Sequence, residues 1–212
     1  MKYLKLYEDI DYEYQRELSR IMILCNKYNI DNYTINDDGS IDVNGSVTVY
    51  NKGLDKLIIK FGNVSDSFYC SQNRLTSLEG CPKYVGGVFS CMRNRLTSLE
   101  GCPEYVGEFF DCSDNEITSF KGSPDKIHYG FSCSNNKIRS FEGCPSINGR
   151  FECDGNPIYH IWKLFTDCDK IELFNDYDII RDDNIIILDR LNDFLEEIGK
   201  PTVTEVQNYK CI

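Results

Sequence analysis

The sequence is poor in positive charge and in histidine, and it has no long apolar run. Lys and Arg number 23 against 34 Asp and Glu, so the formal net charge of the 212 residues is −11. Such a surface repels a phosphate backbone, which excludes nucleic acid as a partner. No stretch approaches the roughly 18 consecutive apolar residues of a membrane-spanning helix. Met1 to Lys5 lead into acidic residues instead of an apolar signal core, so we expect no membrane association and a cytoplasmic location.

Metal-binding and disulfide patterns are missing as well. The 11 cysteines are odd in number and form no C-x-x-C pair, while His128 and His160 are the only histidines. Without an export signal, these cysteines are expected to be reduced thiols. A structural zinc site needs grouped Cys and His ligands. We therefore expect neither a metal nor another cofactor.

The sequence does contain an internal repeat. Its fullest copy runs from Phe89 to Pro103 and follows the pattern F-x-C-x-x-N-x-L-x-x-L-x-x-C-P. A weaker copy surrounds Val49, where Lys52 replaces the Asn. About six coils therefore lie within residues 41–158, with a repeat length typical of solenoids. The strand cysteines lie 21 residues apart, with a last step of 20, at Cys70, Cys91, Cys112, Cys133 and Cys153.

Each copy predicts one short strand. The period of two in F-x-C places the aromatic ring and the thiol in the core and the residue between them outside. Successive strands would stack into a parallel sheet with a phenylalanine ladder beside the cysteine ladder. The phenylalanines are Phe68, Phe89, Phe110, Phe131 and Phe151.

An asparagine recurs where each predicted strand ends. A buried amide at this turn can bond the backbone of its own copy and of the adjoining copy. The apolar residues that follow would re-enter the core through a loop or a single helical turn, which a Gly-Cys-Pro or Gly-Ser-Pro sequence ends. The predicted asparagine ladder is Asn73, Asn94, Asn115, Asn136 and Asn156.

Over residues 41–158 the pattern resembles the leucine-rich repeat L-x-L-x-x-N-x-L-x-x-L-P, with Phe and Cys in place of the usual strand leucines. The L-T-S-L-E-G-C-P motif is more specifically similar to short leucine-rich-repeat proteins encoded by large tailed bacteriophages. The resemblance implies an α/β solenoid with short parallel strands, whose concave face binds another protein. For a phage protein that partner would be a bacterial host protein, met in the host cytoplasm.

The flanks predict helical caps over the apolar ends of the array. Residues 1–40 contain an amphipathic helix between Tyr12 and Tyr28 that closes at Asn29. Residues 159–212 predict two or three helices, one of them over 185–198, and Trp162 is expected to cover the last coil. The N-cap candidates are Asp182, Asp183 and Asn184, and Gly199-Lys200-Pro201 is the expected stop.

The outward strand positions define the predicted binding surface. Exposed aromatic residues and Met anchor many interfaces, although some of them here would only cover neighbouring side chains. Arg74, Arg93 and Arg95 are expected to form a basic rim, which would meet a carboxylate-rich partner or remain a solvated edge. The predicted partner-binding residues are Tyr50, Tyr69, Val88, Met92, Phe109, Asp111, Arg150 and Glu152.

Three functions from different classes remain open. The first is a protein-binding module that acts on a host protein, with inhibition of host defence as one version. The second is a structural or assembly component of a phage particle, which a stable homo-oligomer would favour. The third is a small-molecule sequestering protein, which needs a deep pocket. Catalysis is not expected, because His128 has no nucleophile at an interpretable spacing and Cys168 lies in no catalytic motif.

Overall fold

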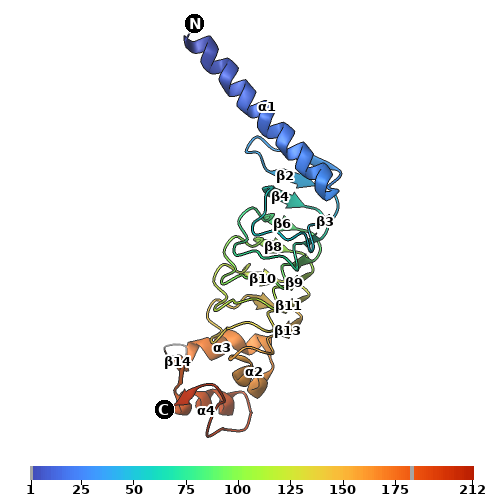
Figure 1. Cartoon of the computed structure of the whole chain (residues 1–212). Coiled ribbons are helices and arrows are strands. Elements are labelled where there is room, and N and C mark those ends of the chain that lie inside the picture. Colours follow the sequence, from blue (N-terminus) through green and yellow to red (C-terminus); the bar gives the residue numbers. More distant parts are fainter. Residues whose placement is uncertain (1, 182–183) are drawn as a thin grey trace.

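The chain forms an elongated α/β structure in which parallel strands stack between helices at the two ends (Figure 1). This structure is a computed structural model that describes residues 2–181 and 184–212, with backbone alone for residues 2–11. Two of the predicted N-cap candidates, Asp182 and Asp183, lie outside the described residues.

Most repeats contribute two short strands, and each of the two joins a different parallel sheet. In the six-stranded sheet, of order β13-β11-β9-β7-β5-β3, Phe68 pairs with Phe89 and Phe110 with Phe131. Its strands are β3 (Val47–Thr48), β5 (Phe68–Tyr69), β7 (Phe89–Ser90), β9 (Phe109–Asp111), β11 (Gly130–Ser132) and β13 (Arg150–Glu152). Strand register therefore follows the sequence repeat.

The seven-stranded sheet has the order β1-β2-β4-β6-β8-β10-β12, and only its first pair is antiparallel. Its strands are β1 (Tyr33–Ile35), β2 (Ile41–Val43), β4 (Phe61–Val64), β6 (Tyr84–Val85), β8 (Tyr105–Val106), β10 (Lys126–Ile127) and β12 (Ser146–Ile147). The sequence pattern did not predict these strands, because β6, β8, β10 and β12 each turn a single apolar residue inward and so show no alternation.

The core lies between the two sheets. The predicted phenylalanine and cysteine ladders of the six-stranded sheet are confirmed, since all ten side chains are buried. The ring centroids of Phe89 and Phe110 lie 5.1 Å apart, and those of Phe110 and Phe131 lie 5.3 Å apart. Val85 and Val106 face these rings from the seven-stranded sheet and are fully buried. Burial of this apolar area is the main stabilising contribution of each repeat.

The asparagine ladder is confirmed by its hydrogen bonds. In the copy centred on Asn115, Oδ1 accepts from the Leu96 amide at 3.0 Å, while Nδ2 donates to the carbonyl oxygens of Cys91 and Cys112, both at 3.1 Å. Each asparagine therefore ties its own repeat to the preceding one. Among the side chains that the structure describes, every buried nitrogen or oxygen has a hydrogen-bond partner.

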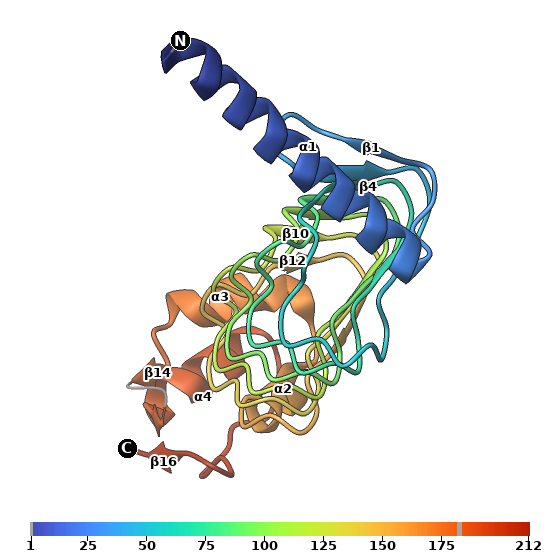
Figure 2. The ribbon, with the colours of Figure 1, turned by 45° about the horizontal axis from the view of Figure 1, so that its top comes forward.

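The N-terminal helix α1 (Lys2–Tyr28) is longer than the predicted helix over 12–28 and ends where expected, with Asn29 at a φ of 53°. Ile21, Cys25 and Tyr28 are buried against the first strands. The N-terminal half of α1 extends away from the rest of the molecule (Figures 1 and 2). Only the C-terminal half of the helix therefore covers the end of the array.

The C-terminal part combines helices with a small sheet, where helices alone were predicted. The expected helix over 185–198 is wrong at its start: Ile185–Ile186 form a strand, and Ile187, not Asn184, is the N-cap residue. Three consecutive β-branched residues favour the extended backbone there. The elements are α2 (Tyr159–Phe165), η1 (Cys168–Lys170), α3 (Ile171–Asp176), β14 (Ile180–Arg181), β15 (Ile185–Ile186), α4 (Leu188–Glu197) and β16 (Lys210–Cys211).

Trp162 on α2 covers the last repeat as predicted. Its ring packs edge-on against Phe151 of β13, with centroids 4.9 Å apart, and the indole is buried. Helix α4 ends before Gly199, which has a φ of 71°, so the expected stop is also found. The aromatic core of the repeats thus continues without a break into the C-terminal helices.

Candidate functional site

The structure places the predicted apolar binding residues on neighbouring strands of the six-stranded sheet. Tyr69 lies in β5 and Phe109 in β9, while Val88 directly precedes β7 and Met92 follows it. Tyr50 follows β3 and is 43% exposed, and the other four are partly exposed. Parallel neighbours are about 4.8 Å apart, and the five residues lie in or beside four consecutive strands of one sheet. We call these five residues the apolar patch.

A glycine sets one boundary of the apolar patch. Phe109 and Gly130 are register partners in β9 and β11. A Cβ atom on Gly130 would lie 2.8 Å from Cε2 of Phe109, which shows that the phenyl ring lies over the glycine. Any larger residue at position 130 would push the ring away from this position.

Beyond Gly130 the face is polar and largely satisfied by its own hydrogen bonds. Ser134 Oγ donates to Asp154 Oδ1 at 2.7 Å, and Arg150 pairs with Glu152. The residue between Phe and Cys was expected to be exposed, but Ser90 and Ser132 are buried. Serine is short enough for larger neighbours to cover it.

The rim arginines are exposed, and two of them already have carboxylate partners. Arg74 Nε lies 3.3 Å from Asp55 Oδ1, and Arg93 Nε lies 3.3 Å from Asp114 Oδ2. The charge of Arg95 helps to lower the carboxyl pKa of Glu116, although Lys137 lowers it more. Exposed pairs of this kind are weak and exchange partners at little cost. The rim is therefore less basic than its sequence indicates.

An aromatic stack on the seven-stranded sheet was missed in the sequence. The rings of Tyr84 and Tyr105 lie 4.8 Å apart and 2° from parallel, and His128 contacts Tyr105 with centroids 5.4 Å apart. Tyr84 is 42% exposed and Tyr105 38% exposed. The Tyr-Val-Gly sequence that recurs after 21 residues was the available signal. This second exposed surface is the natural comparison for the apolar patch.

The repeat cysteines are unsuited to nucleophilic chemistry. Burial raises the thiol pKa of Cys91, Cys112 and Cys133 well above the ordinary value, and it raises the pKa of Cys102 to about 12. At Cys168, burial and then the neighbouring Asp167 and Asp169 also raise the pKa. Since the thiolate is the reactive form, the buried Cys91, Cys112 and Cys133 act as small apolar core residues, while Cys102 and Cys168 are partly exposed.

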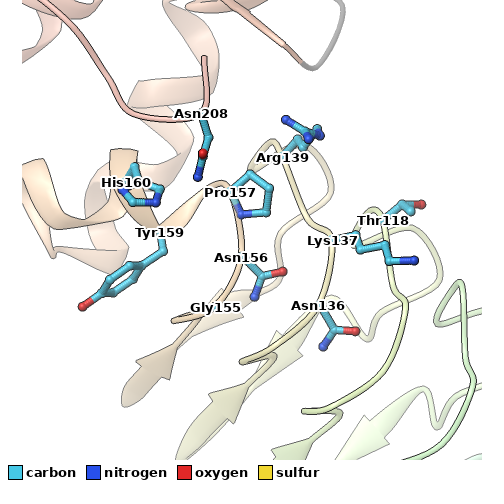
Figure 3. Close-up of a pocket in the computed structure, with 10 residues that line it drawn as sticks. All are labelled: Thr118, Asn136, Lys137, Arg139, Gly155, Asn156, Pro157, Tyr159, His160 and Asn208. Carbon is cyan, nitrogen blue, oxygen red and sulfur yellow. The ribbon is translucent and has the colours of Figure 1, made fainter.

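A cleft opens where the last repeats meet the C-terminal tail (Figure 3). Its volume is about 680 Å³. Arg139, His160 and Asn208 surround its upper part in the view of Figure 3. Lys137 also lines the cleft, and its ammonium group lies 2.8 Å from Glu116 Oε2. The cleft therefore combines residues from four separate segments of the chain, the last of them in the C-terminal tail.

By its fold, the chain falls in the class of α/β proteins with parallel sheets. A scan of family models, a search of curated proteins and a search of solved structures found no match. Within residues 2–181 and 184–212, no three His, Cys, Asp or Glu side chains are grouped to hold a metal ion. The helices in the same part of the chain are all too short or too polar to cross a membrane.

Proposed function

We propose that the chain is a leucine-rich-repeat-type solenoid that works as a non-enzymatic protein-binding module through the apolar patch. The solenoid assignment is supported by strand pairing at 21-residue intervals and by the asparagine ladder. The binding role depends chiefly on one observation, the partial exposure of five large apolar side chains on one sheet face. Exposed apolar patches of this kind mark interaction sites.

The sheet holds the apolar patch in a preformed arrangement. Strands β5, β7 and β9 each have a hydrogen-bonded neighbour on both sides. Little conformational entropy is then lost when a partner binds, which favours affinity per buried area. The same face of the six-stranded sheet also carries the acidic residues Asp111, Glu152 and Asp154. A partner with an apolar centre and a basic edge therefore fits this face.

The resemblance of the repeat sequence to phage proteins supports a bacterial host protein as the partner. Inhibition of a host defence protein is the version of this role that we favour. The raised pKa values of the buried thiols support a role without covalent catalysis.

Affinity capture from a bacterial lysate, read by quantitative mass spectrometry, tests the proposal. Thr48 is exposed and pairs with Tyr69 in register, so the double variant Thr48→Arg/Tyr50→Ala adds bulk and charge beside the apolar patch without disturbing the core. We expect at least tenfold weaker capture, equal to about 1.4 kcal/mol. The triple variant Tyr69→Ala/Met92→Ala/Phe109→Ala should lose capture to a similar or greater extent.

The matched control is Tyr84→Ala/Tyr105→Ala on the seven-stranded sheet, which removes similar exposed aromatic area. It should capture the same protein as the wild type, and all variants should keep nearly the wild-type melting temperature. Equal capture by the wild type and the Thr48→Arg/Tyr50→Ala variant would contradict a role for the apolar patch.

A second candidate, a homo-oligomeric assembly component, is favoured by the exposed helix. Tyr12, Tyr14, Met22 and Ile23 on α1 are each at least half exposed. Exposed apolar side chains on a projecting helix suit helix–helix association. Light scattering separates the candidates: a monomer agrees with the binding module, and a stable oligomer that α1 substitutions dissolve would favour assembly.

A further inference from the structure

The cleft beside the C-terminal tail is lined by basic and polar side chains. Among its ten lining residues are Lys137, Arg139 and His160, and none is Asp or Glu. The whole chain carries a net charge of −11. Lys137 is paired with Glu116, and burial together with the nearby Lys163 lowers the pKa of the His160 imidazole, so within the part of the chain that the structure describes Arg139 carries the unpaired positive charge of the cleft. An unpaired cation on an acidic protein suits an anionic ligand.

Arg139 is the side chain with the most unused binding capacity there. Six of the nine arginines, at positions 16, 20, 74, 93, 150 and 190, lie within 4 Å of a carboxylate oxygen. Among the described side chains Arg139 has no such partner, and its guanidinium donates one hydrogen bond, to Asn184 Oδ1 at 3.0 Å. A guanidinium has five N–H donors, so most remain available for a ligand.

The backbone of Arg139 is held in place by the tail. The Tyr209 hydroxyl donates to the Arg139 carbonyl oxygen at 2.6 Å, and the preceding Ile138 amide donates to Asn156 Oδ1 at 2.9 Å. These bonds fix the backbone of Arg139, and the bond to Asn184 Oδ1 restricts its side chain. His160 and Asn208 lie across the cleft from it and can each donate an N–H (Figure 3).

These donors approach from different sides, which suits a tetrahedral anion better than a planar one. We propose that the cleft binds a phosphate group, as free phosphate or as the phosphomonoester of a small ligand, with Arg139 as the principal contact. Arginine matches phosphate with two parallel hydrogen bonds, and charge-assisted bonds are about twice as strong as neutral ones. The inference goes beyond the proposed function, because neither the apolar patch nor a protein partner takes part.

Isothermal titration with inorganic phosphate at pH 7, with ionic strength held constant by chloride, tests the proposal. We expect saturable binding by the wild type, with a dissociation constant on the order of 1 mM. Arg139→Gln should bind at least about tenfold more weakly, as expected for the loss of a charge-assisted bond. Arg95→Gln removes the same charge from an exposed position outside the cleft and should bind like the wild type.

A second variant tests the proposal even if Arg139→Gln does not fold. Asn208 is exposed, so Asn208→Asp should fold and should weaken binding by placing a carboxylate in the cleft. Glycerol 3-phosphate distinguishes the two sources, because tighter binding than inorganic phosphate identifies a phosphomonoester. Equal, non-saturating heats in all variants, or acetate binding as tight as phosphate, would overturn the proposal. Arg139→Gln should still capture the protein partner, so failure here leaves the proposed function untouched.

Discussion

Replacing Asn136 with alanine is expected to lower the free energy of unfolding by about 3 kcal/mol. Its Oδ1 accepts from the Ile117 amide at 2.9 Å, and its Nδ2 donates to the carbonyl oxygens of Cys112 and Cys133 at 3.1 and 2.9 Å. The side chain is buried, so no bulk water replaces these bonds. Alanine would leave the buried Ile117 amide without a partner and would remove one of the two asparagine bonds to each carbonyl group. Urea unfolding at 25 °C measures the change.

Asn148→Ala is the matched control, because Asn148 is exposed between β12 and β13 and only its backbone joins the ladder of hydrogen bonds. Its effect should stay within about 0.5 kcal/mol. Asn94→Ala, at a slightly more exposed step of the ladder, should cost about 1 to 3 kcal/mol. If Asn136→Ala were as mild as Asn148→Ala, the asparagines would not hold adjacent repeats together.

Replacing Gly107 with alanine is expected to destabilise the protein by about 3 kcal/mol or more, as severe overpacking does. A Cβ atom there would collide with the carbonyl oxygen of Gly86 and lie 2.9 Å from its carbonyl carbon. Both groups are backbone, and the Gly107 amide also donates to the Val85 carbonyl oxygen at 2.9 Å. The strands therefore have to separate to admit a methyl group. Thermal unfolding gives the size of the loss.

Gly45→Ala provides the comparison. Gly45 has a φ of 137° and nothing within 4 Å of its added Cβ atom, so only backbone strain opposes alanine there. We expect a cost of about 1 kcal/mol. Equal melting temperatures for the two variants would show that β6 and β8 are farther apart than the structure places them.

The ladders of the core were predictable because the sequence repeats the same side chain at a fixed interval. A phenylalanine that recurs every 21 residues on equivalent strands has to pack against the phenylalanines of the adjacent repeats, and the same holds for Cys and Asn. The positions of Phe110, Cys112 and Asn115 were therefore correct. The end of α1 and the role of Trp162 followed from helical periodicity and from the need to cover an apolar end.

The rest depended on information that periodicity does not carry. Strands such as β6 hold one inward residue, Val85, which is too short a signal for alternation. The cleft joins Arg139 and His160 with Asn208, which lies outside the repeat array and comes close only when the C-terminal part folds back (Figure 3). The burial of Ser90 reflects the size of its neighbours, which a single-strand pattern ignores.

The most direct test of the binding proposal is hydroxyl-radical footprinting of the chain with and without its captured partner. Met92 in the apolar patch is partly exposed, and Met22 on α1 is 56% exposed and serves as the internal control. We expect the partner to reduce the oxidation of Met92 and Tyr50 severalfold and to leave the oxidation of Met22, Tyr84 and Tyr105 unchanged. Protection of Tyr84 and Tyr105 with no protection of Met92 would contradict it and assign binding to the seven-stranded sheet.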